Sequence, residues 1–164
     1  MAGLVLATLT LAACGGPAPE QNQPEAASTP SGAAPVGSDA AGYVAQAGAI
    51  LDAEQAAFGA FFGPERGALE TADGIAAGTA HIRTFHTAVF ALRGQARALA
   101  IPAKATLFSD AFLEHFDRFV DDAQRMLDAL DAADPARAAD VYRRLKRGAF
   151  ERLTTLREKL ALVA

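Results

Sequence analysis

The stretch that decides the fold is residues 102–131, PAKATLFSDAFLEHFDRFVDDAQRMLDALD. Its large apolar residues recur every three or four positions, which places them on one face of an α-helix. Pro102 suits the first turn of such a helix, where the backbone N–H has no partner in any case. The spacing predicts one long amphipathic helix whose buried face carries Phe108, Phe112, Phe116, Phe119, Ala123, Met126, Leu127 and Leu130.

Three further segments show helical periodicity, at residues 39–62, 72–100 and 135–164. Gly63-Pro64 ends the first segment because proline cannot continue the backbone hydrogen bonding of a helix. Asp134-Pro135 supplies an N-cap and a first-turn residue for the last segment. No segment has the alternation of a strand. The sequence therefore predicts an all-α fold, a four-helix up-down-up-down antiparallel bundle.

The net charge of the predicted helices alternates along the chain. Segments 39–62 and 102–131 are acidic, whereas segments 72–100 and 135–164 are basic. In an up-down-up-down bundle each helix then faces opposite charge on its sequential neighbour, which favours this order. Exposed ion pairs are each worth less than about 1 kcal/mol, so the alternation tunes pairing more than stability.

The sequence before residue 39 has a different character. An apolar run at residues 4–9 leads into Leu11-Ala12-Ala13-Cys14, and Gly15-Gly16-Pro17 follows. These residues resemble the lipobox of a bacterial lipoprotein, in which the cysteine is diacylated and becomes the new N-terminus. The resemblance covers the first fourteen residues. It implies a signal peptide at residues 1–13 and lipidation of Cys14, the only cysteine in the chain.

The resemblance also implies a location in the bacterial cell envelope. Two or more acyl chains anchor a protein stably, so a lipidated Cys14 would hold the chain on a membrane without a transmembrane segment. Gly15 in place of an aspartate implies passage to the outer membrane, with the protein facing the periplasm. The alternative is a cytosolic protein with a chance match, because residues 1–3 lack the Lys or Arg of a signal peptide.

Residues 14–38 are predicted to form a tether. After Cys14 this stretch is rich in Pro, Ala and Gly and has few large apolar side chains. Such a composition cannot bury enough surface to offset the entropy lost on ordering, so we expect disorder. Residues 39–164 are then the helical domain.

Two histidines are candidate metal ligands. His86 and His115 lie on the apolar stripes of their predicted helices, one about fifteen residues before Ile101 and the other about fourteen after it. Antiparallel helices would place both rings at nearly one level, where imidazoles suit Zn²⁺ or Cu²⁺. The alternative is that each ring is hydrogen-bonded to a carboxylate or to the backbone. Glu54 lies on the apolar stripe of its own predicted helix. We expect it to lie at least one helical turn away from the two histidines along the bundle axis.

A basic run on the last predicted helix is the candidate partner-binding surface. It consists of Arg143, Arg144, Lys146 and Arg147. These residues could contact anionic headgroups or an acidic partner. The alternative is a solvated face that complements the acidic segment 102–131.

Composition and the lack of catalytic motifs disfavour several classes of function. A net charge of −4 does not favour nucleic-acid binding. No Ser-His-Asp constellation or Gly-rich phosphate loop is visible, so neither an enzyme nor a cofactor is expected. The expectation is a membrane-anchored envelope lipoprotein acting as a non-enzymatic protein-interaction module. The alternative is a helical bundle that binds a small ligand or metal through His86 and His115.

Overall fold

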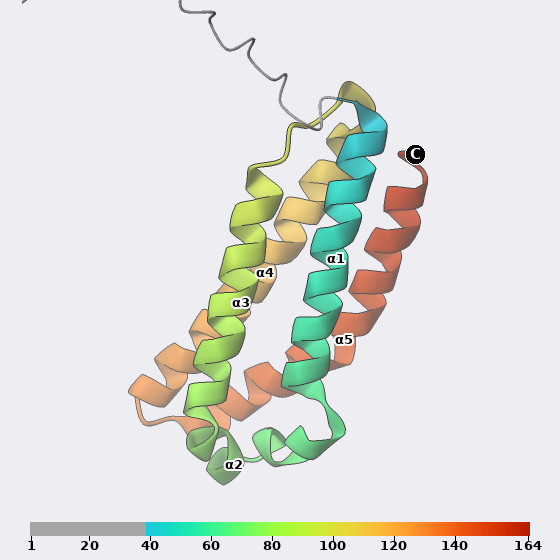
Figure 1. Ribbon diagram of the computed structural model, residues 1–164. Helices are drawn as coiled ribbons and strands as arrows, with labels where there is room; N and C mark the ends of the chain where they lie inside the picture. The colour runs from blue at the N-terminus through green and yellow to red at the C-terminus, as the bar shows by residue number, and fades with distance from the viewer. Residues whose placement is uncertain (1–38) are drawn as a thin grey trace, which may run out of the picture. The chain divides into compact units, whose positions relative to one another are not determined.

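The computed structural model describes residues 39–164, which form helices joined by turns (Figure 1). The α-helices are α1 (Ala40–Phe62), α2 (Ala72–Ala77), α3 (Thr79–Arg97), α4 (Thr106–Asp131) and α5 (Pro135–Ala161), and the 3₁₀-helices are η1 (Pro64–Glu70) and η2 (Ala103–Ala105). No strand occurs among the described residues, which confirms the all-α prediction. The predicted signal peptide, residues 1–13, and the predicted tether, residues 14–38, lie outside them.

The four long helices lie side by side around one apolar core (Figure 1). Helices α3 and α5 each pack against both α1 and α4. On the predicted buried face of α4, only Leu127 and Leu130 are partly exposed. The largest fully buried side chains are Tyr43, Tyr142, Phe58, Phe61, Phe112, Phe116, Phe119, Leu51, Ile75, Ile82, Met126 and Leu145. The start of α1, the turn before α4 and the end of α5 lie at one end of the domain, and η1 and α2 lie at the other.

The predicted helix 72–100 is interrupted at Gly78, which separates α2 from α3. A Cβ atom at Gly78 would lie 2.2 Å from Leu69 Cδ2, and one at Gly74 would lie 1.8 Å from the carbonyl oxygen of Ala68. Helix η1 therefore approaches these two positions so closely that glycine is required. The prediction of one continuous helix is wrong here because η1 packs against its first turns.

Aspartate N-caps mark the first turns of α1 and α5. Asp39 Oδ1 accepts a hydrogen bond from the amide of Gly42 at 2.6 Å, and Asp134 Oδ1 accepts one from the amide of Arg137 at 3.0 Å. These bonds satisfy backbone donors that a helix leaves free in its first turn. The predicted helix from residue 102 begins with the short η2 turn before α4.

Ion pairs join two of the helix interfaces. Asp117 of α4 lies 2.7 Å from Arg97 and 3.5 Å from Arg93, both on α3. Arg157 of α5 lies 2.7 Å from Asp52 of α1. Each of these pairs links an acidic helix to a basic one, as the alternation of charge along the sequence predicts.

Candidate binding groove between α4 and α5

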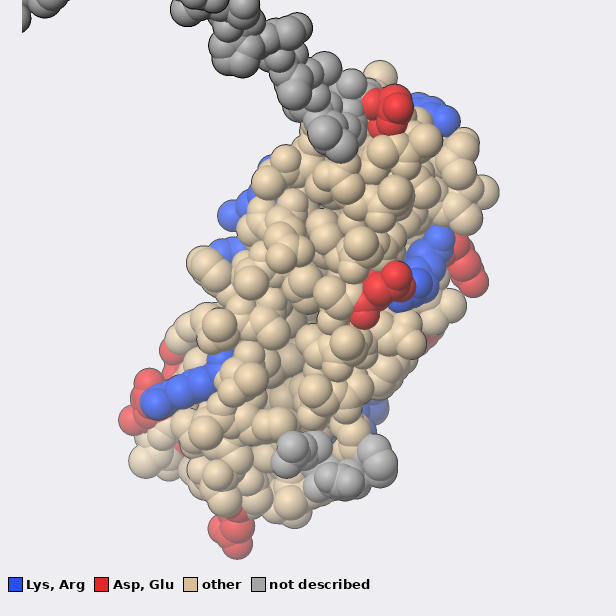
Figure 2. Space-filling model, in the orientation of Figure 1, with Lys and Arg blue, Asp and Glu red and all other residues tan. Residues whose placement is uncertain are grey.

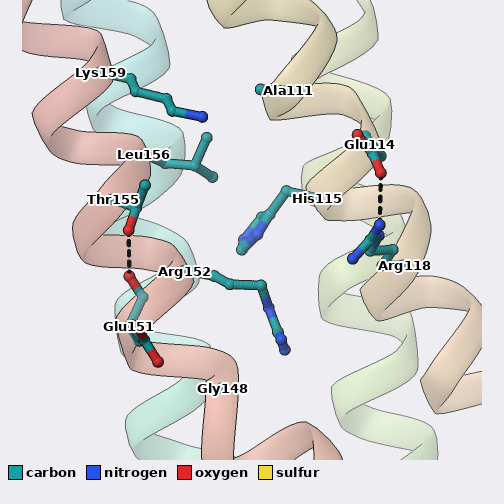
Figure 3. A pocket seen from close by; sticks show the side chains of 10 residues that line it. All are labelled: Ala111, Glu114, His115, Arg118, Gly148, Glu151, Arg152, Thr155, Leu156 and Lys159. Carbon is teal, nitrogen blue, oxygen red and sulfur yellow. Dashed lines mark hydrogen bonds and ion pairs between the residues drawn. The ribbon is translucent and has the colours of Figure 1, made fainter.

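An open groove of about 410 Å³ lies between α4 and α5. Figure 3 shows the side chains of His115, Arg152 and Lys159 pointing into the space between these two helices. The lining residues are Ala111, Glu114, His115 and Arg118 of α4 and Gly148, Glu151, Arg152, Thr155, Leu156 and Lys159 of α5. The groove is therefore mostly polar at its edges and has an imidazole and a guanidinium inside it.

Arg152 has an unusual position for a surface arginine. Its guanidinium carbon lies 5.1 Å from the centre of the Phe119 ring, a cation–π arrangement. Its Nε atom is buried and makes no hydrogen bond within the described residues. A buried donor without an acceptor is unfavourable, so contacts within the described residues do not fully satisfy this guanidinium.

Gly148 provides the room for this arginine. A Cβ atom at residue 148 would lie 2.4 Å from Arg152 Nη1 and 3.0 Å from its guanidinium carbon. Glycine in a helix interior costs about 0.5–1 kcal/mol relative to alanine. The location of Arg152 gives a physical reason for a glycine in the middle of α5.

His115 is held by a buried carboxylate. Its Nε2 atom lies 2.6 Å from Oε1 of Glu54 on α1, and the two residues are 5% and 0% exposed. Because a carboxylate can only accept, the ring donates from Nε2 whenever Glu54 is ionised. Glu54 Oε2 makes no hydrogen bond among the described residues. The pair fixes the orientation of the imidazole that lines the groove.

The expected separation of Glu54 from His115 is wrong. Glu54 lies fifteen residues after Asp39, and His115 lies fourteen residues after Ile101. Figure 1 places the start of α1 and the turn before α4 at the same end of the domain, so equal counts give equal heights. The matching residue counts are visible in the sequence, and in an up-down-up-down bundle they place Glu54 and His115 at the same height.

His86 has different surroundings. It is half-buried on α3, and its ring centre lies 6.2 Å from that of Phe90, one turn further along the same helix. His115 has Glu54, Phe116 and Phe119 as its neighbours instead. Among the side chains that the structure describes, in residues 39–63 and 67–164, no group of three or more His, Cys, Asp or Glu is placed to hold a metal ion.

The charges around the groove leave two cations without a carboxylate. Arg118 and Glu114 pair with each other at 2.8 Å. Within residues 39–164, neither Arg152 nor Lys159 has an ion-pair partner. The remaining carboxylate in the lining is exposed Glu151. The lining thus holds three cations against two carboxylates.

The basic run divides into two pairs. Lys146 Nζ donates to Glu70 Oε1 at 2.6 Å, and Arg143 donates to the Glu70 carbonyl and to Asp140. The hydrogen bond and charge of Lys146 lower the pKa of Glu70 below its ordinary value. Arg143 and Lys146 therefore attach η1 to α5, whereas Arg144 and Arg147 are exposed without an ion pair among the described residues.

Comparisons with known protein families, with curated proteins and with solved structures found no match for this chain. Within residues 39–164, no helix is both long enough and apolar enough to cross a membrane.

Proposed function

We propose that this chain is a lipid-anchored protein of the bacterial envelope whose helical domain is a non-enzymatic binding module for another protein. The proposal takes Cys14 as the lipidated residue and the outer membrane, on its periplasmic side, as the location. Leu11-Ala12-Ala13-Cys14 supports the anchor. For the domain, the proposed topology is the four-helix up-down-up-down bundle of α1, α3, α4 and α5, which the pairwise packing of these helices supports.

The observation that carries the binding role is the groove between α4 and α5 with its unpaired cations. Arg144 lies four residues before Gly148, and Arg147 lies four before Glu151. Residues four apart occupy one helix face, so these two exposed arginines lie on α5 one turn before groove-lining residues. An acidic segment of a partner protein would complement this line of charge.

The anchor is tested by replacing Cys14. We expect the wild-type chain to incorporate labelled palmitate and to fractionate with the envelope membranes, and the Cys14→Ala variant to do neither. Identical labelling and fractionation of the two chains would overturn the envelope assignment and favour a cytosolic protein.

The binding role is tested by photo-crosslinking in intact cells. A benzophenone amino acid at Thr155, inside the groove, should give a discrete product of higher mass. The same group at exposed Ala91 of α3 serves as the matched control. The same product from both positions, or none from Thr155, would contradict a partner in this groove.

A metal-binding bundle on His86 and His115 is the second candidate. The observation in its favour is the Glu54 carboxylate on His115, because metal-bound histidines usually donate their other ring N–H to such a group. Metal analysis of the purified protein, with His86→Ala and His115→Ala variants, tests it. Metal-free protein without micromolar affinity for Zn²⁺ or Cu²⁺ removes this candidate.

A further inference from the structure

We propose that the α4–α5 groove binds a carboxylate or phosphate group of its ligand, with Arg152 as the main contact and Lys159 as the second. This inference rests on the proposed binding role of the groove and names the chemical group that it recognises. The starting observation is that Arg152 Nε is buried next to the groove without an acceptor. Arginine carries five N–H donors in a planar fork that matches both kinds of oxyanion.

The surroundings of Arg152 hold the guanidinium ready for such a ligand. The Phe119 ring lies 5.1 Å from its central carbon, which is a cation–π contact that favours this location of the charge. The missing side chain at Gly148 removes the atom that would collide with Nη1. The ring contact holds the guanidinium at the groove and Gly148 leaves room for it there, so less entropy is lost when a ligand binds.

The carboxylates that line the groove form no ion pair with Arg152 or Lys159. Glu114 is occupied by Arg118 at 2.8 Å. Glu151 is exposed to water, where its charge is well screened. Lys159 lines the same groove and has no ion-pair partner within residues 39–164. An incoming oxyanion would therefore meet two cations whose charge is not already compensated.

The ligand's remaining contacts follow from the rest of the lining. His115 has its Nε2 bonded to Glu54 and is almost fully buried, so its ring forms part of the groove wall on the α4 side. Leu156 and Ala111 supply apolar surface next to it. The groove therefore suits an anionic group attached to a short apolar stem, and an acidic side chain of a partner protein has this form.

The experiment uses the full chain purified in detergent micelles and two probes, inorganic phosphate and succinate. Amide resonances of Gly148 and Thr155 are followed by NMR during each titration. We expect saturable shifts with at least one probe, and the probe with the higher affinity identifies the preferred group. Arg152→Gln should weaken binding at least tenfold, and Lys159→Gln about threefold.

The Gly148→Ala variant tests the geometry without removing a charge. It should weaken binding at least threefold because the added methyl displaces the guanidinium. Gly94→Ala is the matched control, since a Cβ at Gly94 on α3 meets nothing within 4 Å. Arg83→Gln, at an exposed arginine of α3, controls for loss of one positive charge. Circular dichroism of each variant verifies that it is folded.

The inference is overturned if neither probe shifts these resonances, or if folded Arg152→Gln binds as tightly as the wild type. Failure of the binding role looks different. A crosslinked partner at Thr155 without anion binding would retain the proposed function and reject this inference. Saturable anion binding without any crosslinked partner would retain this inference and reject the proposed protein-binding function.

Discussion

The α1–α3 interface and the α4–α5 interface belong to one domain but are built differently. Between α1 and α3, the rings of Phe61 and Phe85 stack with their centres 4.0 Å apart and their planes 4° apart. Between α4 and α5, Arg152 lies over Phe119 and a groove of about 410 Å³ remains. Figure 2 shows that the face formed by α1 and α3 carries few charged side chains.

The difference is between a part of one interface that aromatic rings close and a groove that charged side chains line. Aromatic rings can be buried completely, so helices that present them close together. Arg152 is only partly buried, so its charged head keeps access to water or to a ligand from the groove. Beside the stacked rings of Phe61 and Phe85 the cavity is only about 70 Å³, although a groove of about 370 Å³ lies further along α1 and α3, lined by Gln46, Ile50 and Gln95 among others. We call the part of the interface that these rings close the closed interface.

The largest predicted effect is on the closed interface. Phe85→Ala should lower the free energy of unfolding by about 3–5 kcal/mol, because it removes a buried ring and leaves a cavity. Arg152→Ala should change it by less than about 1 kcal/mol, as expected for a partly exposed charge. Urea unfolding followed by circular dichroism measures both. Equal losses would show that the two interfaces do not differ in the way described.

A second prediction concerns the buried hydrogen bond between Glu54 of α1 and His115 of α4. Glu54→Gln should lower the free energy of unfolding by about 1–3 kcal/mol, because it disturbs the buried hydrogen bond to His115 and leaves polar atoms without a matched partner. Glu151→Gln, at an exposed carboxylate, should change it by less than about 0.5 kcal/mol. The same urea titrations measure both, and indistinguishable variants would contradict a structural role for the pair.

A third prediction compares an exposed glycine of α3 with the glycine next to Arg152. Gly94→Ala should raise the free energy of unfolding by about 0.5–1 kcal/mol, because alanine is the better helix former and has free space there. Gly148→Ala should give a smaller gain or a loss, because the new methyl meets Arg152. Thermal unfolding of both variants is the measurement. An equal gain at the two positions would show that Arg152 moves away without cost.

The smallest predicted effect is a change in the free energy of unfolding at alkaline pH, caused by ionisation of Tyr43. Burial raises the pKa of the Tyr43 hydroxyl above 10.0, with the hydroxyl of Ser109 acting in the opposite direction. Above pH 10 the unfolded chain then loses this proton before the folded chain does, so stability falls as pH rises. Tyr43→Phe should show a weaker decline between pH 9 and 11 in urea titrations. Parallel pH profiles would assign the decline to other groups.

The sequence is sufficient for the helices but not for the contacts between distant segments. The spacing of Phe108, Phe112, Phe116 and Phe119 predicts α4 correctly because helix periodicity is local. The break at Gly78 depends on where η1 packs, although Gly74 and Gly78 near the start of a predicted helix were a usable signal. Their small size allows the close approach that no local pattern specifies.

The groove was harder to predict than the core. Arg152 is one of several cations on its helix, and such residues usually indicate a solvated face. Only the structure shows that its Nε is buried and that Gly148 gives it room. The candidate metal ligand His115 was recognised from its position on the apolar stripe, but its partner Glu54 required the relative heights of two helices.

The contact between residues 148 and 152 also has an evolutionary consequence. If Arg152 serves binding, natural variants that keep arginine at residue 152 should keep glycine at residue 148. Variants with a shorter residue at 152 should be free to acquire alanine at 148, which is better in a helix. The two positions would then substitute together, and their covariation across homologous sequences would record selection on the groove.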